Sequence, residues 1–83
     1  MILNFMRDGD IELSIEASEI IGIGRSFHGP GCPYGTIILL KGGASYEFAY
    51  TMNKNKFNHI RQEWLVAKTT PPNVLAVDKY IEL

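Results

Sequence analysis

Apolar and polar residues alternate along much of the first fifty positions, a pattern typical of β-strands with one buried face. Ile11, Leu13 and Ile15 are separated by polar or charged residues. The segment 10–16 therefore predicts a strand whose three apolar side chains point one way while its carboxylates point into water.

Two turn signals divide the strands into hairpins. Asp8-Gly9 lies between apolar runs, and Asp-Gly favours a tight hairpin turn because such a turn requires positive φ. The segment Lys41-Gly42-Gly43-Ala44 predicts a second hairpin in the same way. A break is expected at 17–19. The predicted strands span residues 2–6, 10–16, 20–27, 36–40 and 45–51.

The period changes after residue 52. Phe57, Ile60, Trp64 and Leu65 recur at the spacing of one helical face, which predicts a helix from about residue 54 to 68. The prolines of 69–73 end it.

The last ten residues fit two patterns. Leu75, Val77, Ile81 and Leu83 alternate as in a strand, whereas Val74, Val77 and Ile81 also fit one face of a helix. The strand is the favoured interpretation because valine and isoleucine predominate.

These elements predict an α+β fold, a small antiparallel sheet of four or five strands built from two hairpins, with the helix packed on one face. At 83 residues the chain is expected to form a single domain, 1–83. The aromatic stripe Tyr46, Phe48 and Tyr50 is expected to lie in the core under the helix, the alternative being a contact surface for a partner.

The strand 36–40 is apolar on both faces, with Ile37 and Leu39 on one and Ile38 and Leu40 on the other. A single helix covers only one side of a sheet. The second apolar side, or the exposed edges of the sheet, is therefore expected to be covered by the C-terminal tail or by another subunit. We expect self-association, in the first place as a symmetric dimer.

Composition excludes several classes of protein. Eight basic and nine acidic residues give a net charge of −1, which argues against a nucleic-acid binder held by charge. The longest apolar run, 37–40, is far too short for membrane insertion. With one cysteine, Cys32, and no signal peptide pattern, we expect a cytoplasmic protein with a free thiol.

The segment 28–35 reads His-Gly-Pro-Gly-Cys-Pro-Tyr-Gly and predicts a loop. His28 and Cys32 within it suggest a thiolate pair, but the sequence shows neither the orienting group nor the oxyanion hole that such chemistry needs. His28, Cys32 and His59 lack the paired spacing of a metal site. No catalytic residue, metal or cofactor is therefore predicted.

Two stretches carry a family resemblance. Residues 11–23 read IELSIEASEIIGI, and residues 35–50 read GTIILLKGGASYEFAY and precede the predicted helix. Together they resemble the small FlbD-type proteins of flagellar or swarming motility, and similar small bacterial and phage proteins. The resemblance covers about residues 1–67 and implies an accessory protein that acts by contact, with no catalytic residues.

The favoured function is thus a non-enzymatic interaction protein, bacterial or phage, acting through protein–protein contacts. The alternative is a module that binds a small anion or nucleotide in a pocket at a subunit interface, and an enzyme that uses Cys32 is the least favoured. The residues expected to contact a ligand or partner are Arg25, His28, Cys32, Tyr34 and Lys41.

Overall fold

The computed structural model describes residues 1–26, 35–48, 54–70 and 78–83. In this part of the chain six strands and one α-helix follow one another, with two short 3₁₀ turns, η1 and η2, between strands. The elements are β1 Ile2–Arg7, β2 Asp10–Glu16, η1 Ala17–Glu19, β3 Ile20–Ser26, β4 Gly35–Leu40, η2 Lys41–Gly43, β5 Ser45–Phe48, α1 Lys54–Thr69 and β6 Lys79–Glu82. The mixed α+β content agrees with the prediction.

Both predicted hairpins are present. Asp8 and Gly9 join β1 to β2 with φ values of 53° and 84°, so both turn residues adopt the left-handed conformation that a tight hairpin needs. Gly42 and Gly43, with φ of 84° and 87°, turn the chain from β4 into β5. The backbone N–H of Leu40 donates to the carbonyl of Ala44 across this turn at 2.9 Å.

The single sheet of four or five strands is corrected by the structure. The described strands form two three-stranded sheets, sheet A with the order β2-β1-β6 and sheet B with the order β3-β4-β5. The separation occurs at η1, where the predicted break is found. Ala17 is buried there, and its N–H donates to the carbonyl of Met1 at 3.0 Å. The chain therefore leaves sheet A at η1 before β3 begins.

The ambiguous tail forms a strand over Lys79–Glu82, as favoured, but its direction was not predicted. It pairs in parallel with β1, placing Ile81 beside Phe5, so sheet A is mixed rather than antiparallel. A parallel neighbour requires a long crossover connection. Here all of sheet B and α1 lie between β1 and β6 in the sequence, which is why local patterns do not reveal the pairing.

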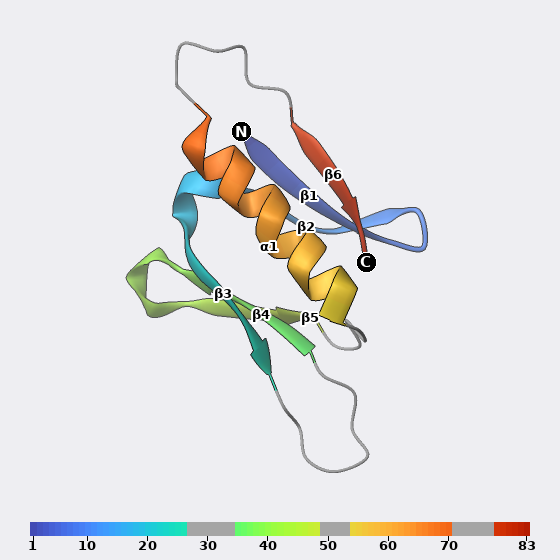
Figure 1. The fold of residues 1–83 in the computed structure, drawn as a ribbon, viewed down its shortest axis with the longest axis horizontal. Coiled ribbons are helices and arrows are strands. Elements are labelled where there is room, and N and C mark those ends of the chain that lie inside the picture. The colour runs from blue at the N-terminus through green and yellow to red at the C-terminus, as the bar shows by residue number, and fades with distance from the viewer. Residues whose placement is uncertain (27–34, 49–53, 71–77) are drawn as a thin grey trace.

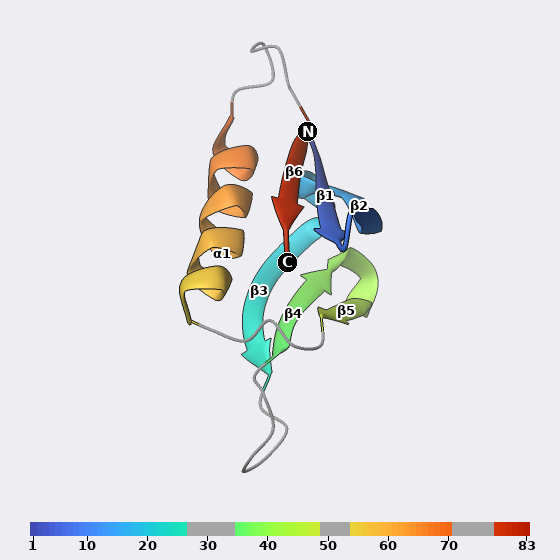
Figure 2. The ribbon, with the colours of Figure 1, turned by 90° about the vertical axis from the view of Figure 1, so that its right-hand side faces the viewer.

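The helix α1 begins at the predicted residue and ends one residue later than predicted. It lies on one side of the molecule with both sheets on the other, as Figures 1 and 2 show together. Two contacts attach it to β6. Lys79 pairs with Glu63 at 3.1 Å, and the Lys56 ammonium donates to the carbonyl of Glu82 at 2.5 Å.

Both contacts fit at once because the spacings agree. Seven residues of helix, Lys56 to Glu63, rise about 10 Å. Three residues of strand, Lys79 to Glu82, rise about the same distance.

The core lies where the inner faces of both sheets meet α1. Phe5 of sheet A and Phe48 of sheet B touch, with ring centroids 4.8 Å apart, and Tyr46 stands edge-on to Phe48 at 5.0 Å. The core interpretation of the aromatic stripe is confirmed for Phe48, while Tyr50 lies outside the described residues. The buried apolar residues are Leu3, Phe5, Ala17, Ile20, Ile38, Phe48, Ile60, Trp64, Ala67 and Ile81.

The alternation predicted for β2 holds for only two of its three apolar residues. Leu13 and Ile15 pack against the core, but Ile11 is 53% exposed. A register shift in the β1–β2 pairing places Leu13 beside Phe5 but Ile11 beside Met6. One residue is thereby added to β2, so Ile11 is carried to the opposite face from Leu13.

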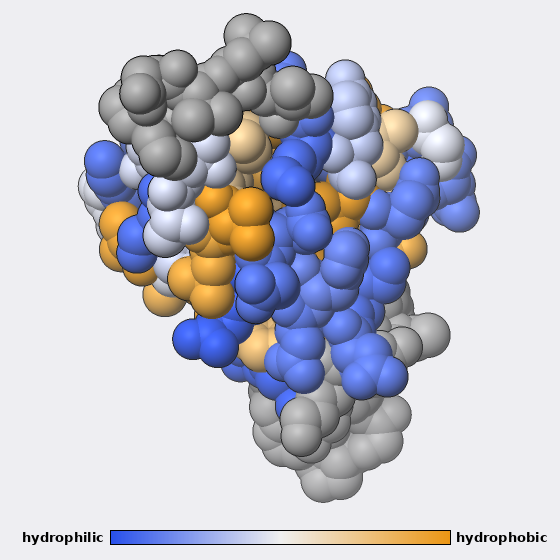
Figure 3. Space-filling view, turned by 45° about the horizontal axis from the view of Figure 1, so that its top comes forward, coloured by the Kyte–Doolittle hydropathy of each residue, from blue (hydrophilic) through white to orange (hydrophobic). Residues whose placement is uncertain are grey.

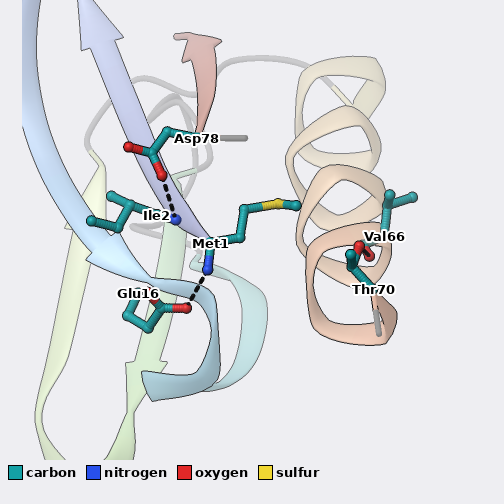
Figure 4. Close-up of polar contacts among 6 residues, drawn as sticks. All are labelled: Met1, Ile2, Glu16, Val66, Thr70 and Asp78. Atoms are coloured by element: carbon teal, nitrogen blue, oxygen red, sulfur yellow. Dashed lines mark hydrogen bonds and ion pairs between the residues drawn. The ribbon is translucent and has the colours of Figure 1, made fainter. Parts of the chain in front are cut away.

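Polar contacts secure one end of sheet A and the end of the helix (Figure 4). The ammonium of Met1 pairs with Glu16 at 2.7 Å, and the N–H of Ile2 donates to the Asp78 carboxylate at 3.2 Å. The Thr70 hydroxyl donates to the carbonyl of Val66 at 2.8 Å, which satisfies one of the carbonyls left open in the last helical turn.

Candidate functional site: the outer face of sheet B

The register of sheet B shows which of its residues face away from the core. Ile20 pairs with Leu40, and Ile23 pairs with the fully buried Ile38. Because Ile20 and Ile23 both face inward and successive side chains alternate, the two residues between them face outward together. This double position is the irregularity that the structure places between Ile20 and Gly22.

The outer face of sheet B is defined by the residues between these inward positions. It consists of Ile21, Gly22, Gly24 and Ser26 on β3, Gly35, Ile37 and Leu39 on β4, and Ser45 and Glu47 on β5. Glu47 is the only charged residue among them.

Large apolar side chains on this face are open to solvent. Ile21 is 59% exposed and Leu39 is 41% exposed. Ile37, which pairs with Gly24 on one side and Glu47 on the other, is partly exposed. Figure 3 views the α1 side of the molecule obliquely, where apolar residues lie among hydrophilic ones. The sequence left open which apolar side of the strand 36–40 the helix covers, and the structure places Ile37 and Leu39 on the side away from the core.

Two glycines keep this face flat. A Cβ placed on Gly22 would lie 3.6 Å from Cδ1 of Leu39, and one placed on Gly24 would lie 3.6 Å from Cγ2 of Ile37. The two β4 side chains therefore extend sideways over the bare backbone of β3. The backbone of β3 at Gly22 and Gly24 is therefore packed under the side chains of Leu39 and Ile37. Both glycines lie within the strand β3.

At one end of the face, polar side chains of β3 and β5 meet over the backbone of β4. The Ser26 hydroxyl donates to the Glu47 carboxylate at 2.6 Å, across the strand that begins at Gly35. A Cβ on Gly35 would lie 2.5 Å from the Ser26 oxygen and 2.9 Å from both the Glu47 Oε1 atom and the Phe48 carbonyl. Gly35 is therefore required for β3 and β5 to join over β4, a role that its place at the end of a Gly-Pro loop did not indicate.

The outer face of sheet A differs in composition. Its centre is the buried Asn4, which accepts a hydrogen bond from Ser14 at 2.6 Å and donates to the carbonyl of Lys79 at 3.2 Å. Arg7 and Glu12 form an ion pair at 2.9 Å nearby. The exposed Ile2, Ile11 and Tyr80 are interleaved with these polar and charged groups. The exposed apolar side chains of sheet A are thus separated by polar groups, whereas Ile21 and Leu39 of sheet B are adjacent.

The predicted contact residues fall in different places. Arg25 pairs with Thr36 near one end of β4, and its Cζ atom lies 5.9 Å from the centre of the Phe57 ring of α1. Lys41 is exposed in η2, beyond the other end of β4. Lys41 follows Thr36 by five positions, which correspond to about 16 Å of extended chain. Within one chain the structure thus keeps Arg25 and Lys41 apart. His28, Cys32 and Tyr34 lie outside the described residues.

Other chemistry has little support in the part of the chain that the structure describes. These residues hold no group of three or more histidine, cysteine, aspartate or glutamate side chains that would bind a metal ion. His59 is exposed on α1. No helix among them is both long and apolar enough to span a membrane.

Comparison of the chain with protein-family models, curated proteins and solved structures found no match. The outer face of sheet B, identified from register and exposure, is consequently the candidate functional site.

Proposed function

We propose that this protein is a non-enzymatic interaction protein, bacterial or phage, that acts through protein–protein contacts made by the outer face of sheet B. The observation that carries this proposal is the exposure of Ile21 and Leu39 on a flat face whose described residues include one charged side chain, Glu47. Burying such apolar surface releases about 25 cal/mol per Å², which favours association.

The polar chemistry of the face also fits a contact surface better than a reaction centre. Its one carboxylate, Glu47, is already hydrogen-bonded to Ser26 at the rim. Flat apolar centres surrounded by polar rims are the usual anatomy of protein–protein interfaces. The cytoplasmic location expected from the sequence remains part of this proposal.

Site-specific photo-crosslinking in cells that carry the gene tests the function. A photoreactive amino acid at Leu39 is expected to form a covalent product with a protein, identified by mass spectrometry as a second copy or a different chain. The matched control is the same amino acid at Ile11, which is similarly exposed but lies on sheet A. Equal products from both positions, or none from Leu39, would contradict the proposal.

A further inference from the structure

The two most exposed apolar side chains of the outer face of sheet B lie at one level along the strands. Leu39 pairs with Gly22, and Ile21 occupies the extra position between Gly22 and Ile20, whose partner is Leu40. Ile21 and Leu39 therefore lie side by side on adjacent strands, about 5 Å apart in the direction across the sheet.

This placement makes the face complementary to itself. Consider a two-fold axis that lies in the face and crosses the strands at the level of Leu39. Rotation about it stacks two copies of the face, with Leu39 against the second copy's Leu39 and Ile21 against the second copy's Ile21. One axis thus buries both exposed side chains, as an isologous interface requires.

The charges select this axis over the other possible one. Glu47 pairs with Ile37, two residues before Leu39, and Lys41 follows two residues after it. Glu47 is therefore displaced by about 7 Å along the strands from the level of Leu39, and Lys41 lies in the opposite direction, at the start of η2 just beyond β4. An axis across the strands brings Lys41 toward the end of the face that carries the second copy's Glu47, whereas an axis along the strands brings Lys41 toward the second copy's Lys41. Opposite charges attract across an interface and like charges repel, so the first arrangement is favoured.

The size of the face sets the strength of such a contact. Three strands of about six residues cover roughly 14 by 20 Å, or about 300 Å² before side-chain relief. Stable interfaces bury about 800 Å² on each partner. The association is accordingly of the weak class, with a dissociation constant in the micromolar range or above. The net charge of −1 adds little repulsion between copies.

We infer that the occupant of the outer face of sheet B is a second copy of this chain, packed face to face about a two-fold axis that crosses the strands at Leu39. This inference rests on the proposed function, since it uses the same face as a contact surface. The dimer has Ile21 and Leu39 at its centre and two Lys41–Glu47 ion pairs at its rim.

Sedimentation equilibrium of the purified chain, from micromolar to millimolar concentration, tests the centre of the interface. The substitution Leu39→Lys places two like charges on the axis and is expected to raise the dimer dissociation constant by about 100-fold or more. Ile11→Lys introduces the same charge at a similarly exposed residue of β2, outside the proposed interface. It is expected to leave the dimer dissociation constant within about twofold of that of the unchanged chain. Circular dichroism of both variants establishes that they fold. A dimer that weakens equally in the two variants would overturn the inference.

A charge exchange tests the direction of the axis. Lys41→Glu and Glu47→Lys each create like pairs at both rim contacts, and each is expected to raise the constant by about threefold or more at low salt. The double variant re-forms both pairs in reverse and is expected to return to within about twofold of the unchanged chain. If the two substitutions weaken the dimer additively in the double variant, this axis is excluded. Glu47→Lys also removes the hydrogen bond from Ser26, but changing Lys41 cannot restore that bond, so recovery in the double variant reports the ion pairs.

The outcomes separate the dimer from the function. If the chain is strictly monomeric at millimolar concentration while crosslinking at Leu39 captures a different protein, the dimer is excluded and the proposed function stands. If the chain is monomeric and position 39 forms no crosslink, both are excluded.

Discussion

Sheets A and B have the same number of strands and share one core, but they treat polar groups in opposite ways. Sheet A buries Asn4 and satisfies it from both neighbouring strands through Ser14 and Lys79. Sheet B buries Thr36 completely, and its hydroxyl has no hydrogen-bond partner among the described residues. On the outer faces, the exposed Ile2, Ile11 and Tyr80 of sheet A lie among polar and charged groups, whereas Ile21 and Leu39 of sheet B lie side by side.

The contrast indicates which sheet is complete by itself. A buried polar group that is fully hydrogen-bonded fixes strand register, and polar outer residues need no partner. Sheet A fulfils the first condition, and its exposed apolar side chains, Ile2, Ile11 and Tyr80, are separated by polar groups. Sheet B is held by apolar packing on its inner face and leaves apolar side chains exposed on its outer face, so sheet B is the one expected to gain from association.

The largest effect is expected at the polar end of sheet B. Gly35→Ala forces a Cβ to within 3.0 Å of the Phe48 carbonyl and into the Ser26–Glu47 contact, and backbone atoms cannot yield as a flexible side chain does. We expect the free energy of unfolding, from urea denaturation, to fall by about 1–3 kcal/mol.

Gly24→Ala is the matched control for Gly35→Ala. Its new Cβ meets Ile37 at an ordinary 3.6 Å, so we expect a change of less than about 0.5 kcal/mol. Similar losses at both glycines would show that a Cβ added at any glycine of this face is destabilising. The close approach of Ser26, Glu47 and Phe48 to Gly35 would then not be the cause of the loss.

The second prediction concerns the polar centre of sheet A. Asn4→Ala removes the hydrogen bonds to Ser14 and Lys79 that join all three strands, and is expected to cost about 1–2 kcal/mol of unfolding free energy. Amide exchange is expected to accelerate in β6 more than in β4. Ser26→Ala, which removes the exposed bond to Glu47, serves as the control and is expected to cost less than about 1 kcal/mol. Equal acceleration in β4 and β6 would mean that Asn4 does not hold sheet A in particular.

The smallest effect has the opposite sign. Thr36→Val replaces a buried hydroxyl that lacks a partner by a methyl group of similar size. We expect the free energy of unfolding to rise by up to about 1 kcal/mol, because an unsatisfied buried hydroxyl is costly. Thermal denaturation at matched concentration measures it. A loss of stability would show that the Thr36 hydroxyl is satisfied in solution, and the contrast between the two sheets would then weaken.

Much of the secondary structure followed from local pattern. The Asp8-Gly9 and Gly42-Gly43 turns, the helix from Lys54 and the strand near Ile81 all depend on residues close in sequence, where φ preferences and apolar spacing act directly. The candidate face was anticipated in part, because Ile37 and Leu39 must lie opposite Ile38 and Leu40 in any strand. Ile21 was not anticipated, because its outward position depends on a register irregularity between β3 and β4.

The sequence by itself determined where the chain turns, where it is helical and that β4 is apolar on both faces, since each is a property of neighbouring residues. The tertiary structure decided the division into two sheets, the parallel pairing of β6 with β1 and the closure at Gly35. These depend on contacts between segments that are distant along the chain, such as Phe5 with Phe48 and Lys79 with Glu63. Such contacts are selected by packing of the whole core, and local periodicity carries no record of them.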